Sequence, residues 1–169
     1  MNKKTKGKLL QVLWFLFKFN LLAVPLYILL YFNFSYRPLQ DFVTFLSYKL
    51  LLTLGVKTSL DGQILKAVNN FNIYFIEMDM DCTGWKSLYT LFSLVMATPS
   101  IKLKKKLFFL IITLPSIFFF NIARIVLTIY ISLIDPNFFE LIHDFLWKFG
   151  LIFAVLASWA LWLRYEKRI

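Results

Sequence analysis

Long runs of apolar residues limit what this chain can fold into more than any other feature. One of them, LFFLIITLPSIFFFNIARIVLTIYISLI (107–134), contains a single charged residue. About 20 apolar residues in a helix are enough to cross the hydrocarbon core of a bilayer. The whole chain is 60% hydrophobic, whereas a soluble domain is about 45–50% apolar. A soluble fold of this length could not cover so much apolar surface, so the sequence predicts an integral membrane protein.

Four runs are predicted to cross the membrane, over residues 9–32, 83–99, 107–134 and 145–163. The first is too long for the core of a signal peptide, and no small-residue cleavage site follows it, so we expect it to be retained. The expected fold class is an all-α integral membrane protein, a helical bundle of these four transmembrane spans. Residues 1–169 are predicted to form a single membrane domain.

Clusters of Lys and Arg at residues 1–8, 102–106 and 164–169 indicate the orientation of the chain. Such clusters are typical of cytoplasmic segments, so both termini are predicted to lie in the cytoplasm. Every acidic residue except Glu166 falls in a segment that this topology places outside, or at the boundary of a span. The basic clusters then face the inner leaflet. Nucleic acid is therefore not an expected partner, despite the net charge of +10.

Residues 33–81 are expected to form an extracytoplasmic or interfacial segment. Within it, residues 38–56 are apolar on average but are interrupted by Asp41 and Lys49. This pattern favours an amphipathic helix at the outer interface or a partly inserted fifth helix. The stretch FNIYFIEMD (71–79) alternates loosely between apolar and polar residues, which is typical of a short strand or extended segment.

The stretch DMDCTGW (79–85) contains the only cysteine of the chain, Cys82, at the outer end of the second predicted span. Asp81 or Thr83 is expected to cap the helix that follows. Free amides and the helix dipole favour a thiolate at a helix start. Asp79 and Asp81 oppose it, because nearby negative charge raises the pKa of a thiol. A cationic partner is therefore needed to favour the thiolate.

Arg124 is the candidate for that partner. It lies about 25 Å along the helix from Leu107, near the outer boundary of a core about 30 Å thick. Asn121, three residues earlier, shares its helix face. The only histidine, His143, stands with Asp144 at the outer end of the fourth predicted span. Cysteine, arginine and histidine are thus expected at one membrane level, from three helices.

Each of these residues also has an ordinary structural interpretation. A single buried cysteine is usually a small hydrophobic side chain, an arginine near a span boundary extends to the headgroups, and a histidine at an interface is common. With one Cys and one His, the chain forms no internal disulfide or structural zinc site. We therefore predict no metal ion and no cofactor.

Three segments, in this order, resemble the exosortase and archaeosortase family of membrane cysteine transpeptidases: DCTGWKSLYTL, NIARI and HDFLW. The run MDMDCTGWK is closer to the archaeal branch. The resemblance implies that Cys82 is the nucleophile, Arg124 its electrostatic partner and His143 the residue that transfers protons. Four residues beside them are expected to support the site: Thr83, Gly84, Asn121 and Asp144. Many members have more spans, so this chain would be a minimal version.

The resemblance also implies the substrates. They are exported proteins whose C-terminal signal consists of a short motif, a hydrophobic helix and a basic tail. The enzyme would cleave near the motif on the outer face through a Cys thioester, and would transfer the new C-terminus to an amine, such as that of a lipid. Lipid is then both the environment of the protein and a candidate acceptor.

Three other functions are compatible with parts of this pattern. A non-catalytic membrane protein that binds a partner would not need Cys82. A small transporter could use Arg124 as an anion site, although the sequence contains no inverted repeat. A membrane phosphatase of the histidine type would need two histidines, and the chain has one.

Overall fold

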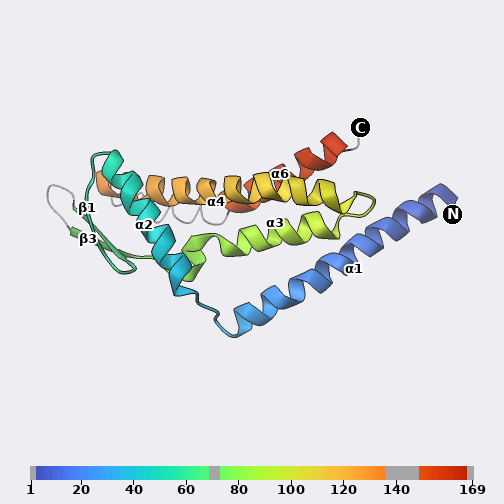
Figure 1. Ribbon diagram of the computed structural model, residues 1–169, viewed down its shortest axis with the longest axis horizontal. Helices are drawn as coiled ribbons and strands as arrows, with labels where there is room; N and C mark the ends of the chain where they lie inside the picture. Colours follow the sequence, from blue (N-terminus) through green and yellow to red (C-terminus); the bar gives the residue numbers. More distant parts are fainter. Residues whose placement is uncertain (1–2, 69–72, 136–148, 167–169) are drawn as a thin grey trace. The chain divides into compact units, whose positions relative to one another are not determined.

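A computed structural model describes residues 3–68, 73–135 and 149–166. The described chain divides into two compact units (Figure 1). The first unit comprises Met1–Phe34, Lys86–Pro115 and Val155–Ile169, and the second comprises Ser35–Trp85 and Ser116–Ala154. The helices are α1 (Lys3–Tyr31), α2 (Arg37–Thr53), α3 (Trp85–Ala97), α4 (Leu103–Ile134) and α6 (Leu151–Glu166), the strands are β1 (Lys57–Asp61), β2 (Ile64–Val68) and β3 (Ile73–Glu77), and η1 (Met80–Thr83) is a 3₁₀ helix.

The first unit contains α1, α3, the start of α4 and most of α6. The Lys106 ammonium donates hydrogen bonds to the carbonyls of Met96 and Thr98, at 2.8 and 2.6 Å, where α3 ends. The Trp159 indole donates to Thr98 Oγ1 at 3.1 Å, and its ring stacks on Phe15 with a centroid distance of 5.6 Å. Carbonyls left free at the end of a helix need partners, and here Lys106 of α4 supplies them, while Trp159 of α6 binds the Thr98 hydroxyl.

Two described helices are long and apolar enough to cross a membrane, namely Thr5–Tyr31 within α1 and Leu103–Ile134, which is α4. The run predicted as a span over 83–99 forms a helix of only 13 residues, shorter than the roughly 20 needed. It is shorter than expected because η1 occupies the start of the run and Pro99 follows its end, where a helix does not continue. The start of the fourth predicted span, residues 145–148, lies outside the described residues.

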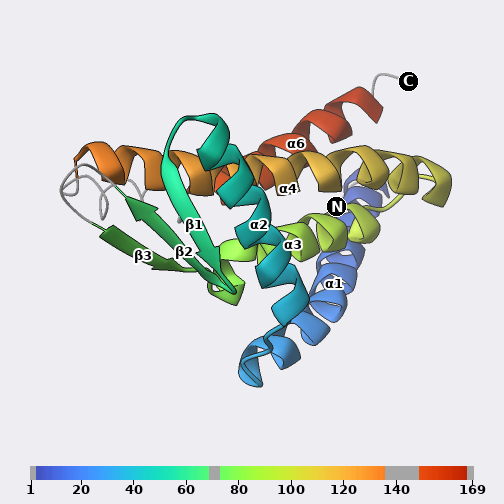
Figure 2. The same ribbon diagram turned by 60° about the vertical axis from the view of Figure 1, so that its left-hand side comes forward.

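The second unit contains a three-stranded antiparallel sheet in the order β1-β2-β3 (Figure 2). The expectation of an all-α fold is therefore wrong for this segment. β3 forms within the stretch for which a strand was expected, but β1 and β2 were not predicted. Asp61 pairs with Ile64 across a two-residue turn at Gly62, whose φ is +59°. Glycine as the first of the two turn residues favours such hairpin turns, which explains why the chain folds back here.

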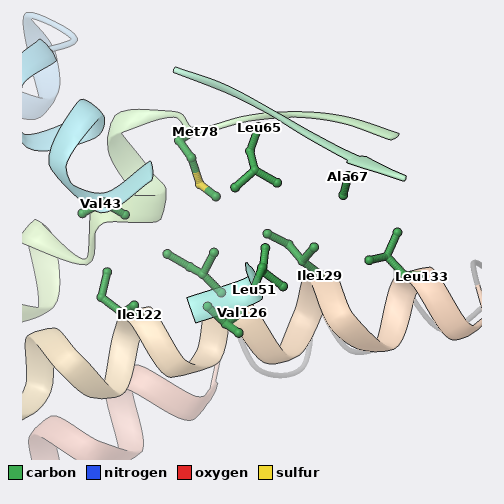
Figure 3. Packing of buried hydrophobic residues seen from close by; sticks show 10 residues of the cluster. Val43, Leu51, Leu65, Ala67, Met78, Ile122, Val126, Ile129 and Leu133 are labelled. Carbon is green, nitrogen blue, oxygen red and sulfur yellow. The ribbon is translucent and has the colours of Figure 1, made fainter. Parts of the chain in front are cut away.

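The core of the second unit lies between α4, α2 and the sheet (Figure 3). Every third or fourth residue along one face of α4 is buried, as expected of a helix packed on one side. This face contacts the buried side of β2 and the buried side of α2 (Ile122, Val126, Ile129 and Leu133 of α4; Leu65 and Ala67 of β2; Val43 and Leu51 of α2). The helix expected over 38–56 is thus α2, and its position in the membrane stays a prediction.

Candidate active site

Cys82 lies in η1, a single turn between β3 and α3. The Asp79 carboxylate caps this turn, because its Oδ1 accepts a hydrogen bond from the amide of Met80 at 2.6 Å. The amide of Cys82 donates to the Asp79 carbonyl at 3.0 Å, which closes the turn. Thr83 is fully buried and donates to the Met80 carbonyl at 2.7 Å. Asp79 therefore caps η1. Of the two residues expected to cap α3, Thr83 accepts a hydrogen bond of 3.4 Å from the first amide of that helix.

Gly84 and Asn121 join this turn to α4. Asn121 is 1% exposed, and its Nδ2 donates to the carbonyl of Cys82 at 2.8 Å. Because a carbonyl can only accept, this bond fixes which way the Asn121 amide points. Gly84 has φ +74°, and a Cβ added there would lie 2.9 Å from Asn121 Cγ. Two features therefore require glycine at this position: its backbone conformation and the close approach of the asparagine side chain.

Arg124 lies one turn beyond Asn121 on α4 and is 7% exposed. Its Nε is buried and has no hydrogen-bond partner in the part of the chain that the structure describes. A buried cation is costly unless an anion or several acceptors surround it. The charge of Arg124 lowers the pKa of Cys82. The positive charge of Arg124 thus favours the thiolate form of Cys82.

The pKa of Cys82 is nevertheless raised above its ordinary value. Burial is the largest cause, and the negative charges of Asp79 and Asp81 raise this pKa further. A backbone hydrogen bond at Asp79 and the charge of Arg124 lower the pKa of Cys82, but they do not outweigh burial. Arg124 acts in the expected direction, but burial makes the Cys82 thiol harder to deprotonate than an ordinary cysteine. A base is therefore needed to make it a nucleophile.

The structure brings five of the seven predicted site residues together in the second unit: Cys82, Thr83, Gly84, Asn121 and Arg124. His143 and Asp144 lie outside the described residues. Sequence reasoning did not predict that Asp79 caps the turn. The signal was present, because an aspartate just before a short helical turn is a favoured cap.

The chain is apolar, and two of its described helices are long enough to span a membrane. Its cysteine lies in a capped turn, and the charge of a buried arginine lowers the pKa of that cysteine. Together these features define a membrane protein with a candidate nucleophilic site. The family model for transmembrane exosortases matches residues 5–163. The chain belongs to the transmembrane exosortase family, and the resemblance seen in its three motifs is confirmed. No curated protein and no solved structure matches the chain.

This family consists of membrane transpeptidases of the cysteine-peptidase class, which act on exported proteins that carry C-terminal signals. Membership and the two apolar helices place the protein in a membrane. The matched region contains every predicted site residue. The assignment to the archaeal branch stays a prediction.

Proposed function

We propose that this protein is a membrane-embedded cysteine peptidase and transpeptidase that cleaves C-terminal sorting signals on the outer face of the membrane. One observation carries the proposal: the only cysteine of the chain sits in a capped turn that Asn121 holds against α4, where the charge of Arg124 reaches the sulfur. A structural cysteine would need neither the cap nor the buried cation.

The first half of the reaction forms a thioester. His143 accepts the proton of the Cys82 thiol, and the sulfur attacks the scissile carbonyl carbon. The carbonyl oxygen becomes an oxyanion, which the Arg124 guanidinium stabilises, and such a donor contributes about 3–4 kcal/mol. The carbon–nitrogen bond then breaks, and His143 returns its proton to the leaving amine. The role of His143 comes from the family resemblance.

The second half of the reaction releases the product. An amine of the acceptor, such as that of a lipid, attacks the thioester carbon while His143 takes its proton. The carbon–sulfur bond breaks, and the proton returns from His143 to the Cys82 sulfur. Water in place of the amine would give hydrolysis. The raised pKa of Cys82 fits this sequence, because the thiol keeps its proton until a base and a substrate are in place.

Substrate binding in this proposal follows from the membrane. The hydrophobic helix of the sorting signal lies among the spans, its basic tail stays in the cytoplasm, and its motif reaches the level of Cys82. The predicted orientation, with both termini in the cytoplasm, places Cys82 on the outer face.

The test is processing of a co-expressed exported protein that ends in a short motif, an apolar helix and a basic tail. Cys82→Ala, Cys82→Ser and Arg124→Ala are expected to abolish processing while the protein still inserts, and His143→Ala should lose most of the rate. Thr128→Val is the matched control, because the buried Thr128 hydroxyl donates to the Arg124 carbonyl of its own helix. Normal processing by Cys82→Ala would end the enzyme proposal in favour of a partner-binding protein.

A further inference from the structure

A buried glutamine of α2 holds the chain just before the turn that carries Cys82. Gln40 is 5% exposed, and its Nε2 donates to the carbonyl of Met78 at 3.2 Å, across 38 positions of sequence. Its Oε1 accepts from Ser35 Oγ at 3.0 Å and from Gln63 Nε2 at 3.4 Å. Both ends of the amide are therefore paired, and the Met78 carbonyl, which can only accept, fixes its orientation.

Met78 is an anchored point of the chain. Its amide donates to the Gln63 carbonyl at 3.1 Å, and its side chain, 2% exposed, points into the core of the second unit (Figure 3). β3 ends at Glu77 and η1 begins at Met80. Met78 and Asp79 are thus the whole connection between the sheet and the Cys82 turn, so any movement of the Met78 carbonyl is passed directly to that turn.

Two side chains from different helices anchor the chain at this turn or just before it. Asn121 of α4 binds the carbonyl of Cys82, and Gln40 of α2 binds the carbonyl of Met78. With one anchor alone, the turn can pivot about it, and the distance from the Cys82 sulfur to Arg124 changes. Both bonds fix the geometry of the turn, and a displacement of about 1 Å can cost roughly 100-fold in rate.

We propose that Gln40 is a positioning residue for the Cys82 nucleophile, which it holds in place through its hydrogen bond to the Met78 carbonyl. The inference rests on the proposed function, because it assigns Gln40 a part in placing the reacting sulfur. It predicts an effect on the chemical step and a change in the accessibility of the thiol, and the second effect does not require catalysis.

The test compares Gln40→Met, which keeps the length of the side chain but removes its hydrogen bonds, with Thr44→Val. Thr44 is also buried on the same helix, and its hydroxyl donates to the Gln40 carbonyl within that helix, so this control changes α2 without removing the bond to the Met78 carbonyl. Gln40→Met is expected to lower kcat roughly 10- to 100-fold with KM unchanged, while Thr44→Val keeps the wild-type kcat. Gln40→Glu keeps the two accepting contacts but loses the donor, and is expected to lower kcat in the same way.

Alkylation of Cys82 by an external maleimide is the second measurement, and it is specific because the chain has one cysteine. The thiol should react faster in Gln40→Met than in the wild type or in Thr44→Val, because a released turn exposes it. The inference is overturned if Gln40→Glu keeps the wild-type kcat, if Thr44→Val loses as much as Gln40→Met, or if the alkylation rates are equal. Normal processing by Cys82→Ala would instead refute the proposed function, and the alkylation result would still decide the role of Gln40.

Discussion

Replacement of Gly84 by alanine is expected to destabilise the second unit and to release the turn that carries Cys82. Gly84 has φ +74°, and this left-handed conformation costs an alanine about 1–2 kcal/mol. The new Cβ would lie 2.9 Å from Cγ and 3.0 Å from Nδ2 of Asn121, so the asparagine must move. Asn121 then loses its bond to the Cys82 carbonyl, and unpaired buried polar groups cost about 1–3 kcal/mol. The free energy of unfolding should therefore fall by about 2–5 kcal/mol.

Gly55→Ala is the matched control for backbone strain. Gly55 also has a positive φ, +79°, but an added Cβ there meets nothing within 4 Å. It should cost only the conformational part, about 1–2 kcal/mol. The difference between the two variants then measures the contact with Asn121. Equilibrium unfolding of the purified protein in mixed micelles gives both values, and the processing assay should show a loss of rate in Gly84→Ala alone.

A double-mutant cycle tests the cause directly. In an Asn121→Ala background the contacts with Cγ and Nδ2 are gone and only the contact with Cβ, at 3.3 Å, is left, so the cost of Gly84→Ala should fall towards that of Gly55→Ala. Equal destabilisation by Gly84→Ala and Gly55→Ala in the otherwise unchanged protein would refute the reasoning. So would a full cost of Gly84→Ala that persists after Asn121 has been truncated.

Two further predictions concern charge. The alkylation rate of Cys82 should rise with pH, and the midpoint of this rise should lie above the ordinary thiol pKa of about 8.5, because burial raises the pKa of Cys82. Arg124→Ala should move this midpoint to higher pH and Asp81→Asn to lower pH. A wild-type midpoint at or below the ordinary value would contradict the account. In the first unit, Lys106→Met should lower the free energy of unfolding by about 1.5–3 kcal/mol, because Lys106 binds two carbonyls where α3 ends. Lys105→Met should cost about 0–1 kcal/mol, since Lys105 is 45% exposed in its ion pair, and equal losses from the two lysines would show that the carbonyl contacts contribute nothing.

The parts of the site that depend on local sequence could be predicted. The spacing of Asn121 and Arg124 places them on one face of any helix, and both are buried on α4. Cys82 in front of a helix was likewise visible in the sequence, as was the family. Regular periodicity and short motifs carry this information, because they depend on neighbours within a few residues.

The parts that depend on distant contacts could not be predicted. Nothing near Gln40 in the sequence indicates that it binds the Met78 carbonyl, because only the folded sheet brings the two together. The direction in which the pKa of Cys82 shifts was also unpredictable, since the burial that raises this pKa comes from packing on the core of the second unit. The hairpin of β1 and β2 is a different case. Gly62 gave a local turn signal, but the strength of the apolar runs on either side favoured an all-helical interpretation.

Covalent capture of the substrate on Cys82 tests the central claim most directly. The full-length protein is mixed with a tailed substrate and quenched in acid, and the peptide that contains Cys82 is examined by mass spectrometry. We expect the mass of an acyl group on Cys82, which hydroxylamine removes and which Cys82→Ala lacks. Substrate cleavage with no such adduct, or with the acyl group on another residue, would contradict the assignment of Cys82 as the nucleophile.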